Sequence, residues 1–413
     1  MEKSHMLIRK QILPYGILLF LCFILPCLDV VGEEDETAPK FAKNDIVHNP
    51  TDITITEDEL INLIKDSRIV FVGETHDNYR AHQVQLQIIK GLFDASEGSI
   101  AIGMEMFQRR SQEKLDAFIS GELPEKQFLK EVWLPDWGYD YDYYKEIFDF
   151  AIANKIKLIA LNANNEFREK INAKGLENLS DEEKKELPEI DLNDEYHRKR
   201  IKSIYDVHGV SKLDDFEKFY RIQCLWDETM ADTAANYLKG SEGQGKQLIV
   251  LAGKGHIRYG FGIPKRLFRR LRESYSTILP VEIEIPENKK HNIMKVKDVQ
   301  IPLVESDFSW MIDYCDPDSV KVRLGLIVMK SEEGVQIHTV LENSTADIVG
   351  MKKGDIVVNV DGTPIEDPFD LVYEMRSKAP GEKGKIVILR DGKEMGLDIM
   401  YQAFKREEKV HPK

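Results

Sequence analysis

Side chains that can bind a metal ion or move a proton cluster at the end of one apolar run. The stretch RIVFVGETHDNYRAHQ (68–83) starts as that run, and four such side chains follow it. They are Glu74, His76, Asp77 and His82. Imidazoles and carboxylates bind divalent metals and transfer protons near neutral pH. A second histidine shares the local frame, because GETH (73–76) and GKGH (253–256) both read GxxH. The paired frames predict a chemical site.

The elements that carry these side chains are predicted strands. Four apolar runs rich in Ile, Val and Leu are typical of strands buried on both faces of a parallel sheet. They cover residues 68–73, 99–107, 155–163 and 246–256. Apolar residues at helical spacing precede the second and third runs, within 78–93 and 141–155. The resulting β-α-β order predicts an α/β domain with a mainly parallel central sheet.

The positions of the polar residues on these strands predict one shared site. Glu74 and His76 follow the first strand, Glu105 closes the second and His256 ends the fourth. The carboxyl ends of parallel strands open into a common crevice, where ligands bind. We therefore expect Glu74, His76, Glu105 and His256 to converge, as catalytic acid-base groups or as ligands of a divalent metal. The glycine of each GxxH frame is expected to let the backbone turn sharply.

Structural roles for several of these residues stay open at this point. Glu105 can instead form a buried ion pair with Arg109 or Arg110. His82 falls in the first turn of a predicted helix and can face solvent. Two acidic residues in WDETMA either cap and pack their own helix or hydrogen-bond to the residues that contact the ligand. They are Asp227 and Glu228.

Length and composition set the limits of the problem. The chain has 413 residues, of which 42% are hydrophobic and 31% charged, as expected of a globular protein with two or three domains. Its formal charge of −15 disfavours non-specific attraction to nucleic acid or to an anionic membrane surface. Nucleic acid is therefore not an expected partner.

The amino-terminal segment has the features of an export signal. Arg9 and Lys10 precede an apolar run of twelve residues, Ile17–Leu28, which is short for a membrane span and suits a signal peptide over 1–32. The acidic, proline-containing stretch 33–45 is expected to be a flexible tether. We expect an exported protein of the periplasm or cell envelope; an uncleaved signal that anchors it to the membrane is the alternative. Outside the signal only Cys224 and Cys315 remain, as one bridge or as free thiols.

Several stretches, in order along the chain, resemble one family. They are VGETHDNYRAHQ (72–83), GMEMFQRR (103–110), LNANNEFREKI (161–171), LWDETMADTAANYL (225–238) and LAGKGHIRYGFGIPKR (251–266). They are similar to the ChaN family of haem-binding, iron-regulated proteins, within the wider Tiki and erythromycin-esterase superfamily. The resemblance covers about 46–316 and includes a helical insertion at 175–191. It implies an exported α/β domain that binds haem. In the family the haems are stacked between two subunits, so the resemblance also implies a homodimer. In the wider superfamily, matching histidines and acidic residues form a hydrolytic site.

The sequence offers several candidates for the residue that binds the haem iron. The chain has no CxxCH motif, which excludes covalent attachment of the c-type. A bound haem needs an axial tyrosine or histidine and apolar walls, and the family resemblance implies a tyrosine. The candidates near the motif histidines are Tyr259, Tyr79 and His82, of which Tyr259 is preferred. A packing role for Tyr259 is the structural alternative.

A second, smaller domain is predicted over 320–403. Short β-rich runs alternate with DG pairs at 361–362 and 391–392, which favour tight hairpins. STADIVGMKKGDIVVNVDGTPI (344–365) resembles the PDZ domains associated with bacterial proteases. The resemblance implies that a loop captures the terminal carboxylate of a peptide that adds to the next strand. The loop residues are Arg323, Leu324, Gly325 and Leu326. A domain that only packs on its neighbour is the alternative.

Two functions follow from these observations. The first is an exported haem-binding protein that takes part in haem or iron handling and whose PDZ domain binds protein C-termini. The second is a hydrolase in which the paired GxxH histidines and the glutamates act by metal-dependent or acid-base chemistry. A third, an envelope scaffold with a vestigial site, needs neither activity. The sequence leaves open whether the protein is an enzyme.

Overall fold

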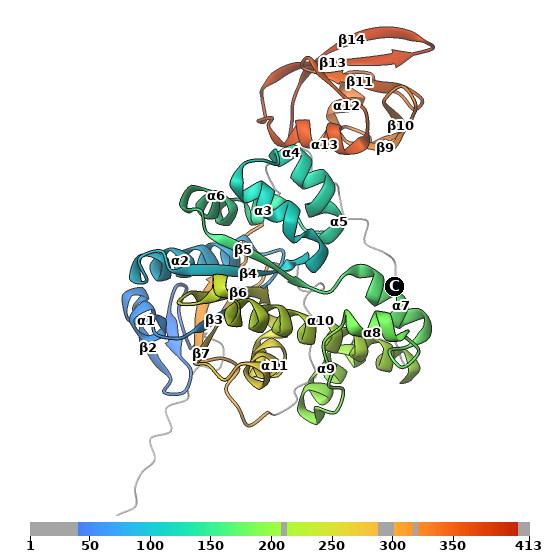
Figure 1. Ribbon diagram of the computed structural model, residues 1–413. Helices are drawn as coiled ribbons and strands as arrows, with labels where there is room; N and C mark the ends of the chain where they lie inside the picture. Colours follow the sequence, from blue (N-terminus) through green and yellow to red (C-terminus); the bar gives the residue numbers. More distant parts are fainter. Residues whose placement is uncertain (1–39, 208–212, 288–300, 317–320, 404–413) are drawn as a thin grey trace, which may run out of the picture. The chain divides into compact units, whose positions relative to one another are not determined.

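The computed structural model describes residues 40–207, 213–287, 301–316 and 321–403 (Figure 1). The predicted signal peptide, and the tether up to residue 39, lie outside the described residues. No helix in the described part is long and apolar enough to cross a bilayer. Both described cysteines, Cys224 and Cys315, are free thiols.

The larger sheet confirms the predicted mainly parallel architecture. Within the described residues it has eight strands in the order β2-β1-β8-β7-β3-β6-β4-β5, and all neighbours from β8 to β5 are parallel. The strands are β1 (Ile46–His48), β2 (Ile53–Ile55), β3 (Ile69–Glu74), β4 (Ile100–Gln108), β5 (Lys157–Asn162), β6 (Gln247–Gly253), β7 (Tyr275–Glu284) and β8 (Phe308–Asp313). Because β6 lies between β3 and β4, the three strands that carry the predicted site are neighbours.

Helices cover both faces of this sheet and bury its apolar side chains. One face packs against α1 (Glu57–Ile64), α2 (Tyr79–Ala95), α3 (Gln112–Ser120), α4 (Glu125–Phe128) and α6 (Lys145–Asn154). The other packs against α10 (Leu213–Lys239) and α11 (Ile263–Arg270). Alternate side chains of β3 are therefore buried on opposite faces of the sheet. Val70 and Val72 pack in one hydrophobic core, and Ile69 and Phe71 pack in the other. This double burial explains why the strands read as continuous apolar runs.

Helices fill much of the described chain between β5 and β6, but of the insertion predicted at 175–191 only Asp181–Lys185 is helical. The segment between β5 and β6 contains α7 (Asn165–Lys174), α8 (Asp181–Lys185), α9 (Glu195–Val207) and the long α10. Ser180 begins α8 with a capping box, in which its hydroxyl accepts from the Glu183 backbone and the Glu183 side chain accepts from the Ser180 backbone. Apolar residues of α7 and α10 form a small core of their own around Phe167 and Leu225. This segment thus brings α9 and α10 beside the end of β6.

The carboxyl-terminal sheet is antiparallel, as predicted. Within the described residues its order is β14-β13-β11-β10-β9, with the short β12 beside β11. Its elements are β9 (Leu326–Lys330), β10 (Val335–Val340), α12 (Thr345–Ile348), β11 (Ile356–Val360), β12 (Thr363–Pro364), α13 (Pro368–Arg376), β13 (Lys383–Arg390) and β14 (Lys393–Met400). Asp391 and Gly392 join β13 to β14 with φ values of 51° and 72°. Positive φ at both positions is the signature of the tight hairpin that DG pairs favour.

Candidate functional site

Glu74 orients His76 at the end of β3. His76 Nδ1 donates to Glu74 Oε1 over 2.7 Å, and Nε2 is the ring nitrogen that lies beside Gly253. Within the described residues Nε2 makes no hydrogen bond. Burial alone would lower the pKa of His76, but the hydrogen bond and the charge of Glu74 raise it, with a further contribution from Glu105. His76 is thus positioned to accept or hold a proton.

Glu74 is fully engaged inside the protein. Besides His76 it accepts from Gln85 Nε2 at 2.8 Å and from the Tyr144 hydroxyl at 2.6 Å. His82 Nδ1 lies 3.5 Å from its second oxygen. Burial would raise the pKa of Glu74, yet the charges of His82 and His76 and the hydrogen bonds from His76 and Tyr144 lower it. A carboxylate with so many donors is held in one orientation, and it fixes the ring of His76 in turn.

Glu105 and His256 meet one another from β4 and from the loop after β6. His256 Nε2 lies 3.3 Å from Glu105 Oε1, and Glu105 Oε2 accepts from the Gly253 backbone N–H at 2.6 Å. His256 Nδ1 donates to Asp227 Oδ1 of α10 at 2.6 Å. Burial would lower the pKa of His256, but the two carboxylates raise it well above its usual value. Burial would raise the pKa of Glu105, but His256 lowers it to about 2.

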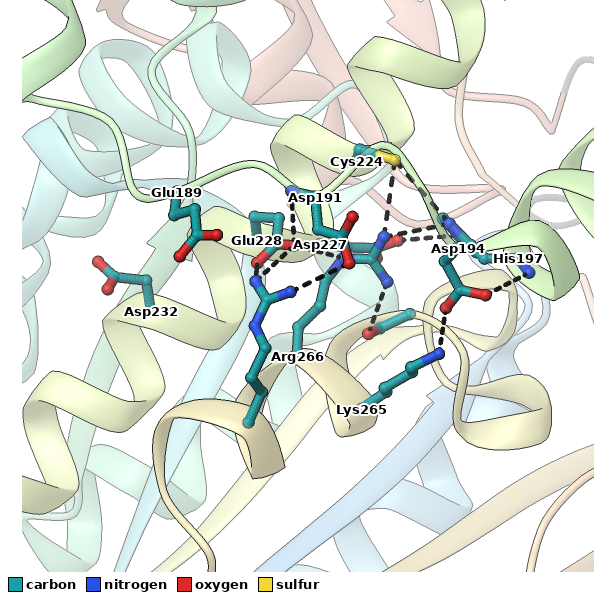
Figure 2. Close-up of polar contacts among 12 residues, drawn as sticks. Glu189, Asp191, Asp194, His197, Cys224, Asp227, Glu228, Asp232, Lys265 and Arg266 are labelled. Carbon is teal, nitrogen blue, oxygen red and sulfur yellow. Dashed lines mark hydrogen bonds and ion pairs between the residues drawn. The ribbon is translucent and has the colours of Figure 1, made fainter.

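Behind Asp227 lies a histidine that the sequence analysis did not single out. His197 of α9 places Nε2 3.2 Å from Asp227 Oδ2, and its Nδ1 lies 3.2 Å from Arg266 Nη2 and 3.9 Å from Cys224 Sγ (Figure 2). Asp227 therefore lies between two imidazoles. Of the two acidic residues predicted in WDETMA, Asp227 contacts a site residue directly, through its bond to His256. Glu228 instead pairs with Arg266, Arg269 and Arg270.

The glycines of the two GxxH frames are needed for space. Neither Gly73 nor Gly253 has a positive φ, so the predicted sharp turn is wrong as the reason for glycine. A Cβ at Gly253 would lie 2.7 Å from Cε1 and 2.9 Å from Nε2 of His76. A Cβ at Gly73 would lie 2.6 Å from Leu279 Cδ2 and 3.3 Å from Lys254 Cβ. Gly253 thus makes room for the His76 ring of the other frame, and Gly73 makes room above all for Leu279 of β7 and then for Lys254.

Aromatic rings surround His76 on its solvent side. Its ring centroid lies 5.0 Å from that of Trp137, edge-on, and 4.9 Å from that of Tyr139. The side chain of His76 is 27% exposed and Tyr139 is 40% exposed. Ligands from solvent can therefore reach the surface formed by His76, Trp137 and Tyr139, which we call the mouth. Trp137 Nε1 donates to the Tyr144 hydroxyl at 3.2 Å, which connects the mouth to Glu74. In the described part of the chain, the Tyr139 hydroxyl makes no hydrogen bond.

The predicted haem ligands lie in three different environments. The Tyr259 hydroxyl donates to Glu305 Oε1 at 2.8 Å, and the ring stacks on Phe261 at 5.7 Å. Tyr79 donates to Glu146 at 2.9 Å. His82 is 2% exposed, so the solvent-facing alternative is wrong; its Nε2 lies 3.2 Å from the His76 carbonyl. Haem ligation by any of the three stays a prediction.

The structural alternative for Glu105 does not hold. Arg109 binds Asp232 at 2.7 Å and Thr233 at 2.7 Å, and Arg110 approaches Asp136 at 4.0 Å. The predicted divalent metal has no support from the geometry: among the described residues, no group of three or more His, Cys, Asp or Glu is placed to hold a metal ion. In this conformation the four predicted ligands pair as acids and bases instead.

The predicted peptide loop lies beside the edge strand of the second sheet. Gly325 has φ 76°, and its carbonyl accepts from the Leu341 N–H at 2.9 Å. The Arg323–Leu326 loop, β9 and the α13 side chains Leu371, Val372 and Met375 line one hollow. Because β9 is an edge strand, its outer N–H and C=O groups can pair with an added peptide strand. Carboxylate capture by the loop stays a prediction.

Comparisons with known proteins separate the two domains. Relatives among curated proteins match short stretches: a probable DegP-like periplasmic serine endoprotease of Pseudomonas putida is 38% identical over 66 residues, and one of Brucella suis is 26% identical over 80 residues. These stretches cover 16% and 19% of this chain but only 14% and 16% of those proteins. The HtrA3 PDZ domain bound to the peptide FGRWV matches 20% of this chain and 86% of its own, with 20% identity and a TM-score of 0.19.

The larger domain has its own matches. A structure described as cofacial haem binding to ChaN of Campylobacter jejuni is 16% identical, covers 64% of this chain and 95% of its own, and has a TM-score of 0.49. The PDZ domain family matches residues 322–400. The family described as haem-binding uptake, Tiki superfamily, ChaN matches residues 60–267, just over half of the 413 residues. The protein therefore belongs to the ChaN family of haem-binding proteins in the Tiki superfamily and carries a PDZ domain.

Proposed function

We propose that this chain is an exported haem-binding protein that holds haem at the mouth formed by His76, Trp137 and Tyr139. The observation that carries the proposal is a ring nitrogen of His76 without a hydrogen-bond partner among the described residues, beside two partly exposed aromatic rings. Membership of the haem-binding family supports it. Haem would supply an iron centre. The chain would supply the side chain that binds the iron, the apolar walls and a base that takes up the proton of that side chain.

The residues of the mouth fit the needs of haem. Tyr139 offers a phenol oxygen to the iron, since its hydroxyl is not engaged by the described residues, whereas that of Tyr259 is held by Glu305. His76 adjoins the Tyr139 ring and can take the phenol proton, because Glu74 stabilises its protonated form. Trp137 provides an apolar wall. We therefore propose that Tyr139, in preference to the predicted Tyr259, would bind the haem iron.

Haem titration of the purified full chain tests this proposal. We expect a Soret band that saturates at a fixed stoichiometry. Tyr139→Phe should shift or abolish the band, and Tyr259→Phe, which changes a hydroxyl bonded to Glu305, should leave it unchanged. A band altered by Tyr259→Phe but not by Tyr139→Phe would show that the ligand assignment is wrong. Size-exclusion chromatography with and without haem tests the possible homodimer.

A hydrolytic activity is the second candidate. It is favoured by the arrangement Glu105–His256–Asp227, in which one imidazole lies between two carboxylates at 3.3 and 2.6 Å, next to the open nitrogen of His76. In this arrangement His76 is the group that can accept a proton from water, and His256 supplies positive charge. Chromogenic esters and amides test it: turnover should be lost in His76→Ala and in Glu105→Gln. Turnover that survives both changes contradicts the assignment.

The second module is proposed to bind the free C-terminus of another protein. The Arg323–Leu326 loop would capture the carboxylate, and β9 would add the peptide as a new strand. Titration of the full chain with the peptide FGRWV and a panel of other apolar C-terminal sequences tests this, each as free acid and as amide. The free acids should bind more tightly. Equal affinity of both forms would refute carboxylate capture.

Export to the periplasm or cell envelope is part of the proposal and rests on the sequence of residues 1–32. Cell fractionation, with mass spectrometry of the mature amino terminus, tests it. Recovery of the intact chain from the cytoplasm would contradict export, and an intact chain in the membrane fraction would identify an uncleaved anchor.

A further inference from the structure

The two GxxH loops are joined by a contact through Lys254 and Glu282, in addition to any contact of the histidines. Lys254, the second residue of GKGH, places its Cβ and Cα 3.3 and 3.4 Å from the position that a Cβ on Gly73 would occupy. Its Nζ then reaches Glu282 Oε2 at 2.7 Å. Glu282 belongs to β7, which is the neighbour of β3 on the side away from β6. The Lys254 side chain therefore crosses the end of β3 from the β6 loop to β7.

Glu282 also holds the other loop. Its Oε1 accepts from Asn78 Nδ2 at 3.2 Å, two residues beyond His76. Asn78 is fully buried and caps α2 by accepting from the Arg80 N–H at 3.1 Å. One carboxylate thus contacts residues from the loops of both His76 and His256. We call Lys254, Glu282 and Asn78 the cross-brace.

The cross-brace is buried at Glu282 and Asn78 and partly exposed at Lys254. The Glu282 side chain is 7% exposed and that of Lys254 30%. Burial alone would raise the pKa of Glu282, but the charge and hydrogen bond of Lys254 lower it. Breaking a buried pair by removing one partner is costly, because the remaining charge stays without compensation. Removing Lys254 alone would therefore leave the Glu282 carboxylate buried without its charge partner.

We propose that Lys254 and Glu282 are positioning residues, which fix the separation of the two GxxH loops and thereby the placement of His76 opposite Glu105 and His256. The placement leaves little freedom, because the His76 ring already lies against Gly253 of the opposite loop. A loop that moves away from its partner carries the ring out of the mouth. The expected effect on haem affinity rests on the proposed haem site. The expected effect on the position of the His76 ring rests on the contacts alone.

Two variants separate positioning from stability. Lys254→Met keeps the apolar stem over Gly73 and removes the ammonium group, which leaves Glu282 buried with a charge. Lys254→Met with Glu282→Gln removes that charge as well, so the stability of the fold should recover while the brace stays broken. Lys157→Met is the matched control, since Lys157 is 35% exposed and binds Asp116 at 2.8 Å in the same domain, on the edge strand β5.

Haem affinity is measured by Soret titration, and stability by thermal unfolding. Both brace variants should bind haem about 10- to 100-fold more weakly than the native chain, the range typical for residues behind a ligand. The control should bind as the native chain does. If the double variant recovers both stability and native haem affinity, the brace only stabilises the fold, and the inference is wrong.

A readout without haem keeps the inference testable by itself. In protein labelled with ¹⁵N at histidine, the ring signals of His76 and His256 should both shift in the double variant and neither should shift in Lys157→Met. If the native chain shows no Soret band, the proposed haem function fails, and these ring signals still decide the brace. Unchanged signals in the double variant would overturn it.

Discussion

Glu105→Gln should remove a pH-dependent part of the stability of the larger domain. Glu105 is 5% exposed and accepts from the Gly253 N–H and pairs with His256. His256 lowers the pKa of this carboxyl to about 2, from 4.5 in the unfolded chain. A lowered pKa stabilises the fold above the unfolded value, and this stabilisation is lost as the pH falls towards the folded value.

The size of the effect follows from the difference between the two pKa values. One pKa unit corresponds to about 1.4 kcal/mol, so the carboxylate contributes about 3 kcal/mol at neutral pH. By pH 3 roughly 2 kcal/mol of that contribution should be gone. The raised pKa of His256 keeps its imidazole protonated throughout this acidic range, so it adds no slope of its own.

Urea unfolding from pH 6 to pH 3, followed by tryptophan fluorescence, measures this contribution. All four tryptophans lie before residue 317, so the signal reports the larger domain alone. The free-energy difference between the native chain and Glu105→Gln should shrink by about 2 kcal/mol over the range. Glu122→Gln, which changes an exposed residue, should show no such trend. A difference that stays constant from pH 6 to pH 3 would show that Glu105 has an ordinary pKa and that it does not pair with His256 in the folded chain.

Three further changes test other parts of the structure. Gly253→Ala should destabilise the domain by about 1–3 kcal/mol and displace the His76 ring, because the new Cβ would lie 2.7 Å from that ring. Thermal unfolding measures the loss of stability, and the NMR signal of His76 measures the displacement. The stability lost in His256→Gln should be largest between about pH 5 and pH 6.5 and should shrink as the pH rises above 6.5, because a raised pKa stabilises the fold fully only below the unfolded value; urea unfolding at pH 6 and pH 10 tests the sign. Gly392→Ala should cost about 1–2 kcal/mol in the PDZ hairpin, because φ is 72° there, and far-UV circular dichroism on heating detects it.

The strands and their order in the chain could be predicted because burial on both faces leaves a strong composition signal. The convergence of Glu74, Glu105 and His256 followed from the geometry of parallel strands, whose carboxyl ends share one edge. Neither step required knowledge of side-chain contacts. Both use properties that a short window of sequence contains.

The remaining parts of the site depend on contacts between distant segments. His197 reaches Asp227 because α9 packs beside α10, and helical periodicity does not tell which residue of these helices faces β6. Tyr139 lies in an irregular stretch between a short helix, α5 (Leu134–Asp136), and a 3₁₀ turn (Tyr141–Tyr143), where no periodic pattern exists. The reason for glycine at 253 also depends on a distant segment, since its neighbour His76 follows another strand.

The contact between His76 and Gly253 also limits how the sequence can change. With histidine at 76, any side chain at 253 collides with the ring; with alanine at 76, the ring is gone and the constraint is relieved. The destabilisation by Gly253→Ala should therefore be much smaller in a His76→Ala background, a non-additive pair. In a lineage that lost the histidine first, the glycine of the opposite frame would be released to vary. Joint loss of the two residues would then identify descendants in which this mouth no longer works.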